Sequence, residues 1–338
     1  MPEPFDDARL DDPDVLRAQD APLRWLAESG SRVRREAQGA RAILQTLDQD
    51  LSPRAVVAAG ADARLLRAVL EPWCPVPFVA WPGPGLPGWA GTLDLVVVLD
   101  PAEADSATGS AVREATRRGC SLITACPPES ELAERAHARY STVVPTQTGD
   151  TLAVAVVMLQ ALHYQGVGPE VNPADVADAL DAVAVECSPH RDISSNPAKE
   201  LALTLADSMP LVWGGSVLAA RAARRVAEAF RRTSGRPSLA AGAGHLLPVL
   251  GAARSRDVFA DPFADVESTT RRPGLVILED GTQEPSVADA RTQLTEAAQA
   301  QDVRTHTIDA TEGPEMARYA ALLATGTYAA AYLGIGLG

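Results

Sequence analysis

The residues that most clearly suggest a binding chemistry are Gly214, Gly215 and Ser216, in the stretch PLVWGGSVLAARAARR. An apolar run ends at Trp213 and an Ala- and Arg-rich segment follows the serine, which predicts a buried strand, a tight turn and a helix. The first N–H groups of a helix have no partner within it and lie at the positive end of its dipole, so phosphate is a natural ligand. No acidic residue adjoins this turn along the chain. It is therefore the best candidate anion site, with a purely structural turn as the alternative.

A second candidate is the turn that follows the apolar strand predicted at residues 54–60. Gly60 could let the backbone approach a phosphate closely, but Asp62 follows it and places a negative charge there. Because the stretch lacks the complete GxGxxG pattern, a plain strand–helix turn is the alternative.

A third candidate is the hydroxyl-rich stretch that follows the apolar strand predicted at residues 93–100. Three side chains there could donate hydrogen bonds to phosphate oxygens: Ser106, Thr108 and Ser110. The preceding residues, DPAEAD, carry three carboxylates that would oppose a dianion. Ser106 could instead cap the following helix.

Residues able to transfer protons are harder to find. The five histidines form no HxxxH or HExxH pattern, and none is near a GxSxG serine. His245, in the glycine-rich stretch GAGHLLPVLG, is the most plausible acid–base group. No carboxylate partner for His245 is evident, so a non-catalytic role for this histidine is the alternative.

Composition excludes several classes of protein. The chain has 338 residues, 46% hydrophobic and 22% charged, which is typical of a globular protein with room for two domains. Its net charge of −14 repels polyanions and argues against nucleic acid as the main partner, although one local turn can still bind a small phosphate ester. Lys199 is the only lysine.

The four cysteines, Cys74, Cys120, Cys126 and Cys187, show no CxxC spacing, which favours reduced, buried thiols and gives no zinc motif. The N-terminus lacks the apolar run of a signal peptide. The apolar tail at residues 318–338 is rich in Ala and Gly, so we expect a buried terminal helix rather than a membrane span.

Alternating strands and helices must position these candidate residues. This alternation predicts an α/β fold with two doubly wound parallel sheets. Strands are predicted at residues 54–60, 76–81, 93–100, 120–126, 141–145, 210–214, 256–260, 274–280 and 303–309. The expected organisation is an acidic leader and helical preamble over 1–48, a first domain over 49–188, a linker over 189–197 and a second domain over 198–338.

Several stretches also resemble a known family. The most specific are LPGW (86–89) and NPAK (196–199); VVAAG, VPFVAW, RRGCSLITA and the closing ARYAALLATGTYAAAYLG occur in order with them over nearly the whole chain. Together they resemble the bifunctional phosphoglucose/phosphomannose isomerases, which contain two sugar-isomerase (SIS) domains, and in particular the actinobacterial branch often named TobH-like. The resemblance implies two α/β/α SIS domains, a homodimer, and isomerisation of hexose 6-phosphates without metal or cofactor.

The residues that do the chemistry in that family are poorly matched here. The family uses a glutamate as base, a histidine of the partner subunit for ring opening, and a Ser/Thr loop for the phosphate. Its first glycine loop, GMGGS, reads GADAR here and retains Gly60, while its SYSGNT loop is replaced by the acidic DPAEADSATGS. Thr233 stands where the glutamate belongs and cannot act as a base. The resemblance therefore implies either that a nearby group, Glu228 or His245, has taken over this role or that the chemistry is lost. His245 precedes the Leu-Pro pair that the family's histidine follows.

Three functions therefore stay open. The first is a hexose 6-phosphate isomerase with altered catalytic residues. The second is a non-catalytic sugar-phosphate sensor or regulatory subunit, which the missing residues favour on chemical grounds. The third, a dinucleotide enzyme, fits the alternation but lacks the glycine fingerprint. For the first two readings we expect a cytoplasmic homodimer that binds a small sugar phosphate, and neither nucleic acid nor a membrane.

Overall fold

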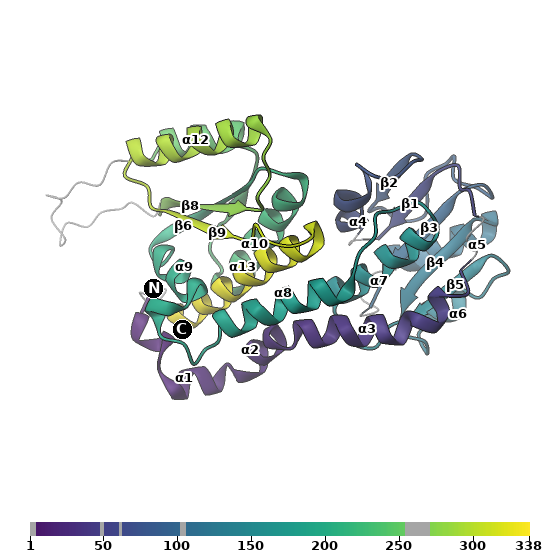
Figure 1. The fold of residues 1–338 in the computed structure, drawn as a ribbon, viewed down its shortest axis with the longest axis horizontal. Coiled ribbons are helices and arrows are strands. Elements are labelled where there is room, and N and C mark those ends of the chain that lie inside the picture. Colours follow the sequence, from purple (N-terminus) through teal and green to yellow (C-terminus); the bar gives the residue numbers. More distant parts are fainter. Residues whose placement is uncertain (1–4, 48–50, 61–62, 102–105, 254–270) are drawn as a thin grey trace, which may run out of the picture. The chain divides into compact units, whose positions relative to one another are not determined.

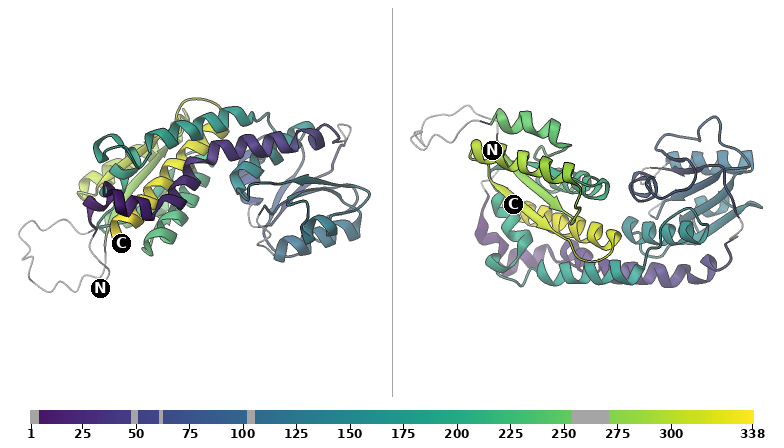
Figure 2. Two further views of the ribbon diagram at one scale, coloured as in Figure 1. Left: turned by 90° about the horizontal axis from the view of Figure 1, so that it is seen from below. Right: turned by 45° about the horizontal axis from the view of Figure 1, so that its top comes forward.

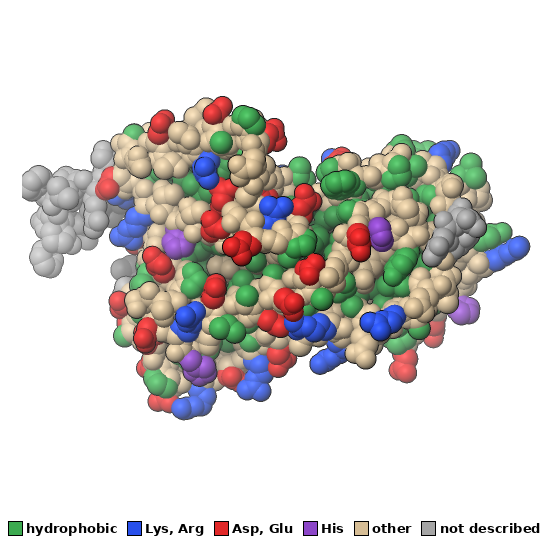
Figure 3. Space-filling view, in the orientation of Figure 1, with side chains coloured by type: hydrophobic (Ala, Val, Ile, Leu, Met, Phe, Trp, Pro, Cys, Tyr) green, Lys and Arg blue, Asp and Glu red, His purple; other side chains and the backbone are tan. Residues whose placement is uncertain are grey.

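The computed structural model describes residues 5–47, 51–60, 63–101, 106–253 and 271–338 (Figures 1 and 2). The chain forms two compact units. We call them the β1–β5 unit, Ser29–Asp178, and the β6–β9 unit, Met1–Glu28 with Ala179–Gly338. Acidic and basic side chains intermingle over the face shown in the space-filling view (Figure 3).

The β1–β5 unit is built on a five-stranded parallel sheet in the order β2-β1-β3-β4-β5. Its strands are β1 (Val56–Ala59), β2 (Phe78–Trp81), β3 (Leu95–Leu99), β4 (Ser121–Cys126) and β5 (Ser141–Pro145). β3 is buried along its whole length, as its continuous apolar run predicts for a strand covered on both faces. The chain reverses its direction of winding between β1 and β3, which places a topological switch point there.

Helices cover both faces of this sheet. They are α3 (Ser29–Leu44), α4 (Ala63–Leu70), α5 (Ser106–Arg118), α6 (Glu131–Arg135) and α7 (Thr151–Tyr164). Small residues of α5, among them Ala111 and Ala115, pack on Val96 and Val98 of β3. On the other face, α7 is apolar almost throughout and packs against α3. The helix α8 (Pro173–Glu186) begins in this unit and ends in the other.

The β6–β9 unit is built on a second parallel sheet in the order β7-β6-β8-β9. Its strands are β6 (Ser208–Gly214), β7 (Leu239–Ala240), β8 (Arg272–Glu279) and β9 (Thr305–Asp309). The elements that complete it are the 3-10 turns η1 (Asp7–Leu10) and η2 (Ile193–Ser195) with the helices α1 (Pro13–Ala18), α2 (Asp20–Ala27), α9 (Pro197–Thr204), α10 (Val217–Ser234), α11 (Ala243–Gly251), α12 (Pro285–Ala300) and α13 (Glu315–Leu337).

Two layers of helices enclose this second sheet (Figure 1). On one face, Leu246 of α11 and Leu294 of α12 pack with Leu211 and Leu275 of the strands. On the other, α10 packs against α13 so closely that a Cβ at Gly326 would overlap the side chain of Val226. The predicted α/β fold with two doubly wound parallel sheets is confirmed.

The terminal helix α13 is long and apolar enough to cross a membrane, but 56% of its most apolar window is buried in the fold. The rings of Tyr328 and Tyr332 lie fully buried and stacked, with centroids 6.4 Å apart. This packing is what the sequence predicts for a terminal core helix.

The division of the chain differs from the expected one in two places. The expected leader and helical preamble over 1–48 is shared between the two units, with the boundary after Glu28. Its first part belongs to the β6–β9 unit, where the amide of Asp6 donates to the carbonyl of Gly336, near the end of α13, at 2.8 Å. The expected linker at 189–197 lies within the β6–β9 unit rather than at its border. The short strand β7 was not predicted, and the strand predicted at 256–260 lies outside the described residues.

Candidate functional site

The predicted glycine turn lies at the topological switch point of the second sheet. Gly214 ends β6 beside Leu278 of β8, and the sheet changes its direction of winding between these two strands. Ser216 caps α10, since its Oγ accepts a hydrogen bond of 3.0 Å from the amide of Ala219. Ligands of open α/β sheets bind beyond the carboxyl ends of strands at this kind of position. The expected strand, turn and helix are therefore present at the switch point of the sheet.

Close packing alone explains both glycines. A Cβ at Gly214 would overlap the backbone of Ala219 in the first turn of α10. A Cβ at Gly215 would overlap Cγ1 of Val287 and crowd the ring of Trp213. The glycine pair thus has a structural reason to exist without any ligand.

A carboxylate, which the sequence did not lead us to expect, stands beside this turn. The hydroxyl of Ser216 donates to Oδ2 of Asp280, which directly follows β8. The amide of Thr282 donates to Oδ1 of the same carboxylate at 3.2 Å. Adjacent parallel strands end at one edge of a sheet, so an acid remote in sequence is brought to the turn. The turn has no acid beside it along the chain, but the fold brings one to it in three dimensions.

Two arginines balance the acids at this edge. Nη1 of Arg318, from the first turns of α13, donates to the backbone carbonyl of Asp280. Arg291 of α12 pairs with Glu279, the last residue of β8. We call the set Gly214, Gly215, Ser216, Asp280 and Arg318 the β6–β8 crevice. The N-terminus of α10 and the Arg318 guanidinium favour an anion at this crevice, whereas the Asp280 carboxylate opposes it.

The structure does not bring the two acid–base candidates to this crevice. Glu228 lies 12 residues beyond Ser216, which is about 18 Å along α10 at the usual rise of an α-helix. Its carboxylate pairs with Arg225 at 3.1 Å. His245 is exposed near the start of α11. Neither side chain shares a described contact with Ser216 or Asp280.

The candidates in the other unit lie around the β1–β3 switch point. Gly60 directly follows β1 with a positive φ of 97°, and its amide donates to the carbonyl of Trp81 at 3.2 Å. Ser106 begins α5, Thr108 is fully buried, and Ser110 is half-buried. Asp62 and the acidic residues 102–105 lie outside the described residues, as does the side chain of Ser106. The burial of Thr108 leaves its hydroxyl facing protein rather than solvent.

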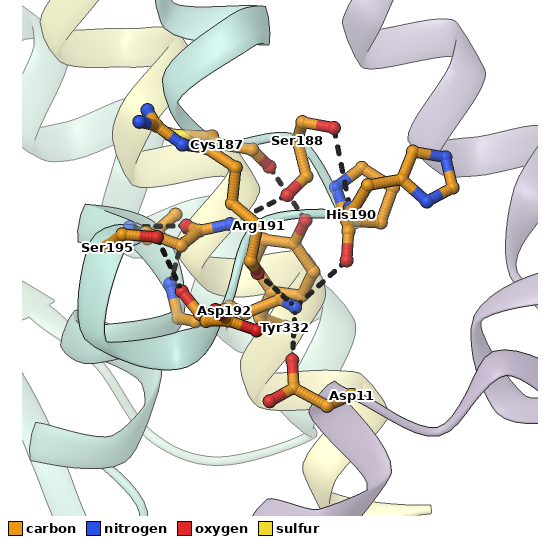
Figure 4. Close-up of polar contacts among 12 residues, drawn as sticks. Asp11, Cys187, Ser188, His190, Arg191, Asp192, Ser195 and Tyr332 are labelled. Carbon is orange, nitrogen blue, oxygen red and sulfur yellow. Dashed lines mark hydrogen bonds and ion pairs between the residues drawn. The ribbon is translucent and has the colours of Figure 1, made fainter.

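Sequence reasoning missed the environment of Lys199, whose neighbours Asp11, Arg191 and Tyr332 are labelled in Figure 4. Its side chain is completely buried in the β6–β9 unit. The ammonium donates to Oδ1 of Asp11 at 2.7 Å and to the carbonyls of Pro189 and Arg191 at 3.0 and 2.9 Å. It also lies 5.5 Å from the centre of the Tyr332 ring, within cation–π range.

The side chains of Asn196 and Tyr332, next to this lysine, are also hydrogen-bonded. Asn196 caps α9 by accepting from the amides of Ala198 and Lys199, and the hydroxyl of Tyr332 donates to the carbonyl of Cys187 at 2.7 Å. Burial raises the pKa of Tyr332 and raises that of the Cys187 thiol to about 12. The three hydrogen bonds of Lys199 satisfy all its donors, so the NPAK stretch fastens the N-terminal segment to the unit and has a structural role here.

Comparison with known proteins agrees with this fold. The family description "Bacterial phospho-glucose isomerase C-terminal SIS domain" matches residues 194–338. A search of curated proteins found no match.

Solved structures with a similar fold include tagatose-6-phosphate ketose/aldose isomerase from Escherichia coli, at TM-score 0.63 and 13% identity, covering 93% of this chain and 90% of that one. The C-terminal domain of glucosamine-fructose-6-phosphate aminotransferase from Francisella tularensis has a TM-score of 0.62 at 10% identity, with coverages of 92% and 94%. A glucose-6-phosphate isomerase like protein from Thermus thermophilus has a TM-score of 0.51 at 18% identity, with coverages of 89% and 91%. Residues 194–338 therefore match a SIS domain, and the whole chain has a fold similar to those of these solved structures.

Proposed function

We propose that this chain binds a hexose 6-phosphate at the β6–β8 crevice and does not isomerise it, acting as a sensor or regulatory subunit. The observation that carries the proposal is the separation of Glu228 and His245 from the switch point where a SIS-type fold would hold its ligand.

Three observations support a phosphorylated sugar as the ligand. The match over residues 194–338 is to a phosphoglucose isomerase domain, and several proteins of similar fold act on sugar phosphates by name. The turn at Gly214–Ser216 opens the 18-residue helix α10, whose dipole favours an anion. Arg318 adds a positive charge at the same edge.

The lack of isomerase chemistry follows from what enolisation requires. A base must reach the sugar carbons C1 and C2, and a positioned base contributes roughly a hundred- to ten-thousand-fold in rate. The Glu228 carboxylate forms an ion pair with Arg225 on α10, and the Thr233 side chain has no basic group. Because neither Glu228 nor Thr233 could supply this base at the crevice, the ligand would be bound and left unchanged.

One alternative is favoured by a specific observation. Asp280 is a carboxylate at the crevice itself, and it could act as the base if it gave up its hydrogen bond from Ser216. The protein would then be an isomerase of glucose or mannose 6-phosphate with a relocated base. In that case Asp280→Asn would abolish turnover.

The experiment is a coupled isomerase assay with fructose 6-phosphate, run beside a thermal-shift measurement with glucose 6-phosphate, mannose 6-phosphate and glucose. Stabilisation by the phosphates, without turnover, is the expected result. Turnover that disappears in Asp280→Asn would replace the proposal by its alternative. Absence of stabilisation by every sugar phosphate would refute both.

A further inference from the structure

A surface cavity of about 530 Å³ lies in the β1–β5 unit, between α3, α7 and the start of α8. Its volume is within the usual range of small-molecule sites. It does not include any residue of the β1–β3 switch point or of the candidate sites described above. We call it the α3–α7 groove.

Helix geometry directs several polar side chains of two helices into this one space. Gln38, Arg41 and Gln45 recur at intervals of three and four residues, so they lie on one face of α3 and the residue after it. Gln160 and Tyr164 have the same relationship on α7. Two facing rows of polar side chains therefore line the groove. The opposite side of each helix packs into the unit.

Most of these side chains have no partner among the residues that the structure describes. In the part of the chain that the structure describes, Gln38, Arg41, Gln45 and Gln160 make no side-chain hydrogen bond or ion pair. This differs from the β6–β8 crevice, where Ser216, Asp280 and Arg318 are already bonded to one another. The groove thus has unused donors and acceptors that a ligand could satisfy.

The chemistry of the lining selects one class of ligand. An amide side chain both donates and accepts hydrogen bonds, which matches the sugar hydroxyl group. The guanidinium of Arg41 presents paired donors that suit a phosphate or carboxylate. Tyr164 is 44% exposed and offers the groove an apolar ring with a polar edge.

We infer that the α3–α7 groove is a second binding site, which takes a monosaccharide that carries a phosphate or carboxylate group. Arg41 would bind the anionic group and the three glutamines the hydroxyls. The site lies in the opposite unit from the β6–β8 crevice and does not depend on the function proposed for it.

Calorimetric titration of glucose 6-phosphate into the full-length protein tests this inference. Arg41→Glu should weaken binding at the groove at least tenfold, because it removes a charge-assisted hydrogen bond and adds repulsion. Gln160→Glu, a change of nearly equal size, should weaken it in the same direction. Arg35→Glu is the matched control, because Arg35 is exposed on the same helix and does not line the groove. Uncharged glucose should bind at least tenfold more weakly than its phosphate.

The outcomes separate this site from the crevice. Two sites in the wild type, one of them weakened by Arg41→Glu, would support both proposals. A single site that Arg41→Glu weakens and Arg35→Glu leaves unchanged would support the groove and refute binding at the crevice. Binding that is identical in wild type, Arg41→Glu and Gln160→Glu would overturn the inference, as would an absence of binding.

Discussion

The hydroxyl of Ser216 donates a hydrogen bond to the carboxylate of Asp280, 64 residues further along the chain. The same hydroxyl accepts from the amide of Ala219 and so caps α10. Its proton is thereby committed to the carboxylate, and the helix terminus best placed to hold a phosphate has a negative charge beside it. This relationship determines how the β6–β8 crevice should respond to mutation.

Asp280→Asn should strengthen the binding of glucose 6-phosphate about tenfold. The charged oxygens of a phosphate at roughly 5 Å repel a carboxylate appreciably, even where the effective dielectric constant is high. Titration calorimetry at low salt would measure the change, which should shrink as ionic strength rises. Glu129→Gln, which alters the net charge equally in the other unit, should leave the affinity unchanged. Weaker binding by Asp280→Asn would instead show that this carboxylate accepts hydrogen bonds from the sugar.

Gly214→Ala should destabilise the β6–β9 unit by about 3 kcal/mol or more, because the new methyl group meets backbone of α10 that cannot move aside. Urea unfolding would give the value. Gly244→Ala is the control, because nothing lies within 4 Å of a Cβ at that helical position. The free energy of unfolding of this variant should rise by up to about 1 kcal/mol. Equal stability of the two variants would refute the close packing of the turn.

Asp11→Asn should lower the free energy of unfolding by about 2–3 kcal/mol, somewhat less than for a fully buried pair because the Asp11 side chain is 46% exposed. The loss arises because the ammonium of Lys199 would stay buried without a carboxylate. Asp14→Asn breaks an exposed ion pair in the same segment and should change stability by less than about 0.5 kcal/mol. If Asp11→Asn proved equally harmless, Lys199 would not fasten the N-terminal segment.

His306, on β9, should make the protein less stable in mild acid. Burial is the main cause that lowers its pKa below the ordinary 6.5, against a smaller opposing effect of Glu200. The unfolded chain therefore binds the proton more readily than the folded protein does. The stability gained by burying the neutral imidazole is complete above pH 6.5, and it is lost as the pH falls toward the lowered pKa. The melting temperature of His306→Gln should decline less between pH 7.5 and 5.5 than that of the wild type. Parallel declines would contradict this assignment.

Local patterns predicted much of the fold. The apolar run at 93–100 and the stretch GLVILED correspond to β3 and β8, because buried parallel strands need continuous apolar sequence. The strand β7 has only two residues, Leu239 and Ala240, and such a short strand leaves no periodic signal.

The site was predicted less well because its contacts are long-range. Asp280 reaches Ser216 through the pairing of β6 with β8, which no local pattern encodes. Lys199 was noticed as the single lysine, but its partner Asp11 is 188 residues away. The surroundings of both groups are set by which strands and helices become neighbours.

The most direct test of the central claim is proton NMR of glucose 6-phosphate incubated with the protein in D₂O. Saturation transfer from protein to sugar reports binding, and loss of the C2 proton or growth of fructose 6-phosphate signals reports enolisation. We expect saturation transfer with the C2 proton retained and no ketose formed. Deuterium at C2, or ketose above a protein-free control, would show an active base and contradict the account.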